Sequence, residues 1–171
     1  MKRLIVSLCL VAIVGTACAD VTQPAIEVNG ESFGRGEVLE LIQDLRPALA
    51  EEDPAVLDCT IRDTAVEVTI ENVLIRDEIS RLGGSINGDD QAQAATQADQ
   101  LLLGAGALFS EDGRPFVQET LELRVALARL VPSEEGASLL QRLIADADVT
   151  IDSRFGDWVP GLGFVPLSPC L

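Results

Sequence analysis

Cysteines and carboxylates are the residue types in this chain that could do chemistry: there are 4 of the first and 28 of the second, and no histidine. Histidine is the usual base for a serine or cysteine nucleophile and a common zinc ligand. Catalysis by carboxylates alone stays possible, but no pair of them stands out. Asp146, Asp148 and Asp152 lie close together near the C-terminus, yet carboxylates that flank a short strand more often cap turns or face solvent than bind a metal. We therefore expect neither an enzyme, nor a cofactor, nor a metal site.

Two of the cysteines, Cys59 and Cys170, lie outside the N-terminal region that processing would change. In an oxidising compartment such a pair can form a disulfide. The bond would close a loop of roughly 110 residues and stabilise the fold by about 4 kcal/mol in the chain-entropy model. Two independent thiols are the alternative, because the sequence does not show that the two Cα atoms come close.

The N-terminus has the pattern of a secretory signal peptide. Lys2 and Arg3 supply a positive charge, and residues 4–14 form an apolar run. That run is too short to cross a membrane as a helix. We expect a signal peptide over residues 1–17, followed by a polar tether over residues 18–24.

Two kinds of cleavage compete at the end of this signal. Residues 15–18 (GTAC) resemble a bacterial lipobox, although Gly15 stands where a branched residue is usual. This interpretation makes Cys18 the lipidation site and anchors the protein to the cell membrane, facing outside the cytoplasm. The alternative is ordinary cleavage after residues 17–19 (ACA), which would release a soluble secreted or periplasmic protein beginning at Asp20.

The charge of the chain limits its partners. The formal net charge is −16 and the pI is about 4.1. A nucleic-acid-binding protein is expected to carry a basic surface, and so is a protein that adheres to anionic lipid. We therefore expect no nucleic-acid partner, and a membrane contact only through the N-terminal lipid.

Apolar residues recur at helical spacing over most of the chain and predict a mainly helical structure. The predicted helices are residues 38–50, 58–82, 91–103 and 116–131, and one that starts at Ser133 and leads to Asp148. Within the second, residues 64–70 alternate as a strand would, but the length of the apolar pattern favours a helix that ends at Gly83. Asp89 or Asp90 is the expected N-cap of the third.

Two short alternating segments predict strands at opposite ends of this helical region. Ile26 and Val28 alternate with Glu27 before an Asn-Gly turn, and residues 149–151 alternate near the C-terminus. Isolated strands need a partner, so we expect these two to pair. The predicted fold is mainly α (α+β), a bundle of about five helices with a small sheet. Arg154, Phe155 and Trp158 are expected to close the domain.

The order of these segments resembles the N-terminal domain of SurA-like chaperones. The resemblance rests on residues 26–33 (IEVNGESF), on residues 75–83 (IRDEISRLG), and on residues 147–158 (ADVTIDSRFGDW). The last is similar to the family's VxVxPRYGxW terminus, with Ser153 in place of proline. The Gly/Val/Pro segment at residues 163–166 is similar to the one that often follows it.

This resemblance implies an exported foldase or holdase domain over residues 25–166, with a tail over residues 167–171. In such a domain helices cradle extended, apolar client segments. Many members also carry a parvulin prolyl-isomerase domain, which we do not expect here because this chain lacks histidine and the length for it.

We therefore expect an ATP-independent chaperone-like protein whose partners are unfolded or extended polypeptides. Leu102, Leu108 and Phe109 are candidate client-binding residues, because the Gly-interrupted segment around them packs less predictably; ordinary core residues are the alternative. A non-catalytic lipoprotein that holds one specific envelope partner is the alternative function.

Overall fold

The computed structural model describes residues 24–46, 54–103 and 110–167 of the chain. It is mainly helical and agrees with the predicted α+β class of about five helices. The elements follow the order β1 (Ile26–Val28), β2 (Glu31–Phe33), α1 (Arg35–Asp44), α2 (Pro54–Arg81), α3 (Gly88–Leu103), α4 (Arg114–Leu130), α5 (Ser133–Asp146), β3 (Val149–Ile151), β4 (Asp157–Val159) and β5 (Gly163–Val165). The predicted signal peptide, Cys18, Leu108, Phe109 and Cys170 lie outside the described residues.

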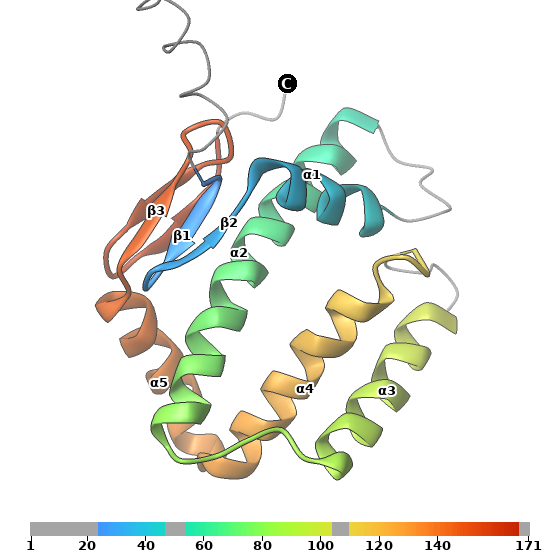
Figure 1. Ribbon diagram of the computed structural model, residues 1–171, viewed down its shortest axis with the longest axis vertical. Helices are drawn as coiled ribbons and strands as arrows, with labels where there is room; N and C mark the ends of the chain where they lie inside the picture. The colour runs from blue at the N-terminus through green and yellow to red at the C-terminus, as the bar shows by residue number, and fades with distance from the viewer. Residues whose placement is uncertain (1–23, 47–53, 104–109, 168–171) are drawn as a thin grey trace, which may run out of the picture.

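The two ends of the helical region meet in one three-stranded sheet of order β2-β1-β3 (Figure 1). The middle strand β1 runs antiparallel to β3, with Ile26 opposite Ile151 and Val28 opposite Val149. The predicted pairing of these two strands is therefore confirmed. Ile26 and Val28 are both 0% exposed because β1 packs against α2.

The third strand of this sheet, β2, is not among the predicted elements. It pairs with β1 through the turn at Asn29 and Gly30, whose φ angles are 50° and 89°. A two-residue hairpin turn of type I′ needs positive φ at both positions, which explains the Asn-Gly pair. The sequence signal for β2 is weak because the strand has three residues and Glu31 and Ser32 are exposed.

The helix α2 contacts α1, α4, α5 and β1, so it forms the centre of the domain. It is continuous through residues 64–70, which confirms the predicted helix over the alternative strand. Two residues beyond the end of α2, Gly83 has a φ of 70°. The N–H of Gly83 donates to Ser80 O at 3.0 Å and that of Gly84 to Ile79 O at 2.9 Å, the pattern of a Schellman C-terminus.

The N-cap of α3 is Asn87, so the prediction that Asp89 or Asp90 caps this helix is wrong. Asn87 Oδ1 accepts from the backbone N–H groups of Asp89 and Asp90, both at 2.9 Å, and Asp90 Oδ2 accepts from Asn87 N at 2.9 Å. This is a reciprocal capping box. Asp90 also pairs with Arg129 of α4 at 2.8 Å, and this hydrogen-bonded pair lowers the pKa of Asp90. The pair joins the start of α3 to the end of α4.

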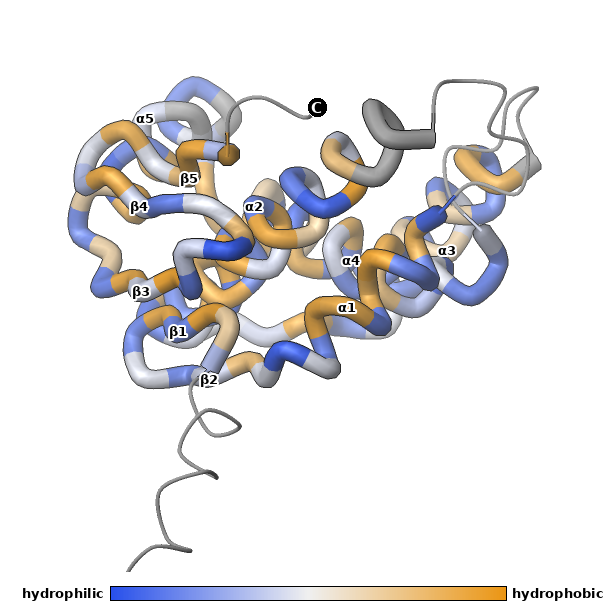
Figure 2. The backbone as a smooth tube through the Cα atoms, turned by 90° about the horizontal axis from the view of Figure 1, so that it is seen from above, coloured by the Kyte–Doolittle hydropathy of each residue, from blue (hydrophilic) through white to orange (hydrophobic). Residues whose placement is uncertain are grey.

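The helices α3 and α4 form an antiparallel hairpin that lies on the opposite side of α2 from the sheet (Figure 1). Figure 2 shows the same order from above, with the strands at one end of the molecule and α3 at the other. Among the helices, α3 packs mainly on α4, and α4 packs on α2. The contact between α4 and α2 is therefore the main one that holds this hairpin to the rest of the domain.

The segment after β3 closes the sheet end of the domain, as predicted. Phe155 is 4% exposed in the main core cluster, and half-buried Trp158 packs against that cluster. Between them, Gly156 has a φ of 153°, and a Cβ there would lie 2.3 Å from the Phe164 ring, so only glycine fits. Arg154 is exposed and pairs with Asp152, and its part in closing the domain stays a prediction.

The pairing of Asp152 with Arg154 in this turn predicts that the stability of the protein depends on pH. Hydrogen bonds from the Arg154 side chain and backbone lower the pKa of Asp152 from 3.8 to about 2. Because the folded pKa is depressed, the stabilisation is present above about pH 4 and is lost as the pH falls through about 2. In denaturant unfolding the stability difference between the wild type and Asp152→Asn should shrink over this range. A difference that stays constant down to low pH would contradict the prediction.

Candidate functional site

Of the predicted site residues, the structure describes Leu102 and Cys59. Leu102 lies in the last turn of α3, is half-buried and packs against a small core cluster that contains Leu45, Ile61 and Ala65. These contacts are those of an ordinary core residue, and a role for Leu102 in client binding stays a prediction. Cys59 is half-buried in α2 and is not a free thiol. Its pairing with Cys170 stays a prediction.

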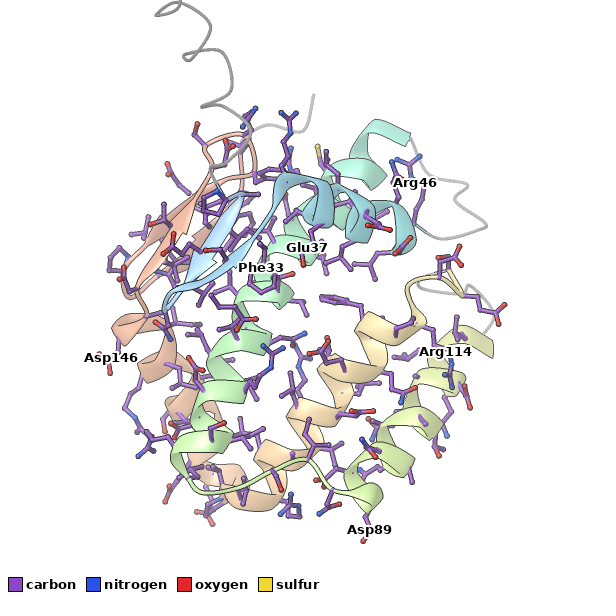
Figure 3. The ribbon with its side chains drawn as sticks, viewed as in Figure 1. Phe33, Glu37, Arg46, Asp89, Arg114 and Asp146 are labelled. Carbon is purple, nitrogen blue, oxygen red and sulfur yellow. The ribbon has the colours of Figure 1, made fainter. Side chains whose placement is uncertain are left out.

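A cleft of about 210 Å³ lies between the end of β2 and the helices α1, α2 and α4. Its apolar lining comes from Phe33, Val38, Leu41 and Phe116. Phe33 and Phe116 are half-buried, so each ring keeps some contact with solvent. Figure 3 shows Phe33 close to Glu37 of α1, where the strand passes into the helix.

The polar part of the lining is a short hydrogen-bond chain between α2 and α4. Asn72 Nδ2 donates to Thr120 Oγ1 at 2.9 Å, and Thr120 Oγ1 donates to the Phe116 carbonyl oxygen at 2.9 Å. Because the hydroxyl proton of Thr120 goes to Phe116, its oxygen must accept from Asn72, and this sets the orientation of the amide. Asn72 is 4% exposed, and its Oδ1 has no hydrogen-bond partner among the described residues.

An unpartnered buried acceptor costs about 1–3 kcal/mol in stability. Asn72 lines the cleft, and although its Oδ1 is itself buried, an occupant that reached it with an N–H or O–H donor would satisfy this acceptor. The same side of α2 carries Thr69, whose hydroxyl donates to Ala65 O at 2.7 Å and is satisfied within the helix. Asn72 is thus the side chain in this wall with a buried polar atom that no described residue pairs.

The mouth of the cleft is charged and mainly acidic. Arg76 lies there and pairs with Glu31 at 3.1 Å and with Glu119 at 2.7 Å. Glu37 also lines the cleft, is exposed, and accepts a hydrogen bond from Gly34 N at 2.9 Å. The single cation is therefore shared between two carboxylates, and the third carboxylate adds a further negative charge.

A second hollow, of about 280 Å³, lies between α1, the first half of α2 and the turn after β3. Arginines from all three elements line it, together with Cys59: Arg35, Arg46, Arg62 and Arg154. Arg62 pairs with Asp63 at 2.7 Å, and Arg154 with Asp152. Because part of its surroundings lies outside the described residues, we assign the candidate site to the first cleft.

The first cleft offers apolar contact, one buried acceptor and an acidic mouth, which is the chemistry of non-covalent recognition.

In the described part of the chain no group of three or more cysteines, aspartates and glutamates is placed to hold a metal ion. None of the helices in residues 24–46, 54–103 and 110–167 is long and apolar enough to cross a membrane.

Sequence reasoning missed this cleft, although one signal for it was present. Ala65, Thr69, Asn72 and Arg76 follow each other at helical spacing along α2, on a helix whose other buried positions are apolar except for Glu78. A small and polar stripe inside a central helix indicates a face that does not pack tightly. The partners from β2, α1 and α4 could not be assigned without the tertiary structure.

Comparison of the chain with protein-family models, with curated proteins and with solved structures found no match. The resemblance to SurA-like domains therefore rests on the sequence motifs alone and stays a prediction.

Proposed function

We propose that this protein is an exported, membrane-anchored and non-catalytic chaperone-like protein that binds unfolded or extended polypeptide segments in the cell envelope. The observation that supports this function best is the cleft beside α2. Its lining of Phe33, Val38, Leu41 and Phe116 suits an apolar side chain, and Asn72 Oδ1 can accept a hydrogen bond from a peptide N–H. An extended segment brings both groups together, because its backbone N–H groups are unpaired.

The size of the cleft favours part of a polypeptide over a small molecule. Pockets that take a drug-sized ligand have volumes of about 300–1,000 Å³. The cleft has about 210 Å³, which is smaller than this range. It therefore suits one side chain of a longer ligand whose remainder lies on the surface.

The purified mature protein should suppress the aggregation of an unfolded secretory protein, as measured by light scattering without ATP. Phe116→Ala should lose most of this protection because it removes one apolar wall of the cleft. Leu162→Ala is the matched control, since Leu162 is 72% exposed at the tip between β4 and β5, away from the cleft. Circular dichroism should show that both variants are folded. An absence of protection at several-fold excess of wild type would contradict the proposal.

The alternative function, a lipoprotein that holds one folded envelope partner, is favoured by a different observation. The tip between β4 and β5 exposes Leu162 and also Val159, which is 41% exposed. A narrow apolar patch of this kind suits a single partner surface. If Leu162→Ala abolishes protection and Phe116→Ala does not, the tip and not the cleft is the binding surface.

The N-terminal processing has its own test. If Cys18 is lipidated, intact-mass spectrometry of protein extracted from membranes should show a diacylglyceryl group on a chain that begins at Cys18. Cys18→Ala should then release the protein from the membrane fraction. A chain that begins at Asp20 would contradict lipidation, because the two cleavages exclude each other.

A further inference from the structure

The charges around the described part of the cleft indicate which polypeptide segments it would select. This inference rests on the proposed function. The mouth holds Glu37 and Glu119, and a third carboxylate, Glu31, shares Arg76 with Glu119. Three carboxylates against one guanidinium leave a negative mouth. The whole chain reinforces this sign with a formal net charge of −16.

The two mouth carboxylates are accessible to a ligand. Glu37 is exposed, and the side chain of Glu119 is 47% exposed. They come from α1 and α4, two of the elements that line the cleft, so a segment that enters it meets an acidic group from each helix. An apolar side chain in the cleft therefore places its sequence neighbours beside these two groups.

We infer that the cleft selects extended segments in which a large apolar residue is flanked by lysine or arginine. The apolar side chain fills the space between Phe33, Val38 and Phe116. A backbone N–H of the segment donates to Asn72 Oδ1, which is otherwise unpartnered. The flanking cations lie against Glu37 and Glu119. Acidic flanking residues are rejected, because like charges at the mouth repel them.

The experiment is an NMR titration of the mature protein with three short peptides of the same length. Their centres are phenylalanine between lysines, phenylalanine between glutamates, and serine between lysines. The Kd should be lowest for the first peptide. Its affinity should fall as the ionic strength rises from about 0.1 to about 1 M, because the Debye length falls from about 10 to about 3 Å. Equal affinity for the first two peptides would overturn the charge selectivity and leave the proposed function standing.

Charge-neutral variants test the mouth itself. Glu37→Gln and Glu119→Gln should each weaken binding of the lysine-flanked peptide by about two- to fivefold, and the double variant should lose most of the preference between the two phenylalanine peptides. The Oε1 of glutamine at position 37 can still accept the hydrogen bond from Gly34 N, so the fold is retained. Glu135→Gln on α5, an exposed carboxylate away from the cleft, is the matched control. An equal loss in the control would show that the total charge and not the mouth is responsible.

Asn72→Leu tests the backbone contact separately. The variant should bind all phenylalanine peptides about fivefold more weakly, with the same charge preference. The variant also removes the hydrogen bond from Asn72 Nδ2 to Thr120 Oγ1, so circular dichroism should first show that it is folded. An unchanged affinity would overturn the role of Asn72. If the wild type itself does not suppress aggregation, the proposed function is overturned instead.

Discussion

Replacing Phe155 with alanine should lower the free energy of unfolding by about 3–5 kcal/mol. Phe155 is 4% exposed and belongs to the core cluster that also contains Ile26 of β1, Val38 of α1 and Val66 of α2. Removing the ring leaves a cavity where the C-terminal segment meets the first strand and two helices. Because small domains have a total stability of about 5–15 kcal/mol, this loss is a large share of it.

The measurement is denaturant unfolding, followed by the fluorescence of the only tryptophan, Trp158. Trp158 packs against the same cluster, so its signal reports on this end of the domain directly. Leu162→Ala is the control: at 72% exposure it should change stability by less than about 0.5 kcal/mol. Equal effects of the two substitutions would show that the segment after β3 does not close the core.

Removing the predicted bond between Cys59 and Cys170 should cost about 4 kcal/mol, since a loop of roughly 110 residues is released in the unfolded chain. The three variants Cys59→Ser, Cys170→Ser and the double substitution distinguish a bond from two separate thiols. If the cysteines are bonded, all three variants should have the same stability. If they are not, the two single effects should add in the double variant.

Treatment with a reducing agent is the matched control for this comparison of the three cysteine variants. It should lower the stability of the wild type to that of the double variant, and it should leave the double variant unchanged. A wild type that does not respond to reduction, although its sulfur atoms are accessible after unfolding, would contradict the disulfide.

The parts of the fold that could be predicted are those set by neighbouring residues. The helical period over α2 and the glycines after it are local features, and they placed this helix correctly against the strand alternative at residues 64–70. The Asn29-Gly30 turn is similar, because positive φ at two successive residues strongly restricts which residues can occupy them. The pairing of β1 with β3 followed because each strand had no other predicted partner.

Helix starts and weak strands were less predictable because their signals compete. Asp89, Asp90 and Asn87 can all cap a helix, and the structure selects Asn87 because Asp90 is held by Arg129 of α4. Arg129 lies far away in the sequence, so its influence on this cap is a tertiary effect. β2 exists because the Asn-Gly turn returns the chain along β1, and not because its own residues favour a strand.

The sequence alone determined that this protein is a mainly helical α+β domain whose first strand, β1, meets β3 beyond the helices, because periodicity and turn propensity are properties of adjacent residues. The tertiary structure alone decided where a ligand could lie. Phe33, Asn72 and Phe116 form one cleft because β2, α2 and α4 converge there, although 39 and 44 positions separate them along the chain. No local pattern encodes that convergence, since it depends on how helices distant in sequence pack on one another.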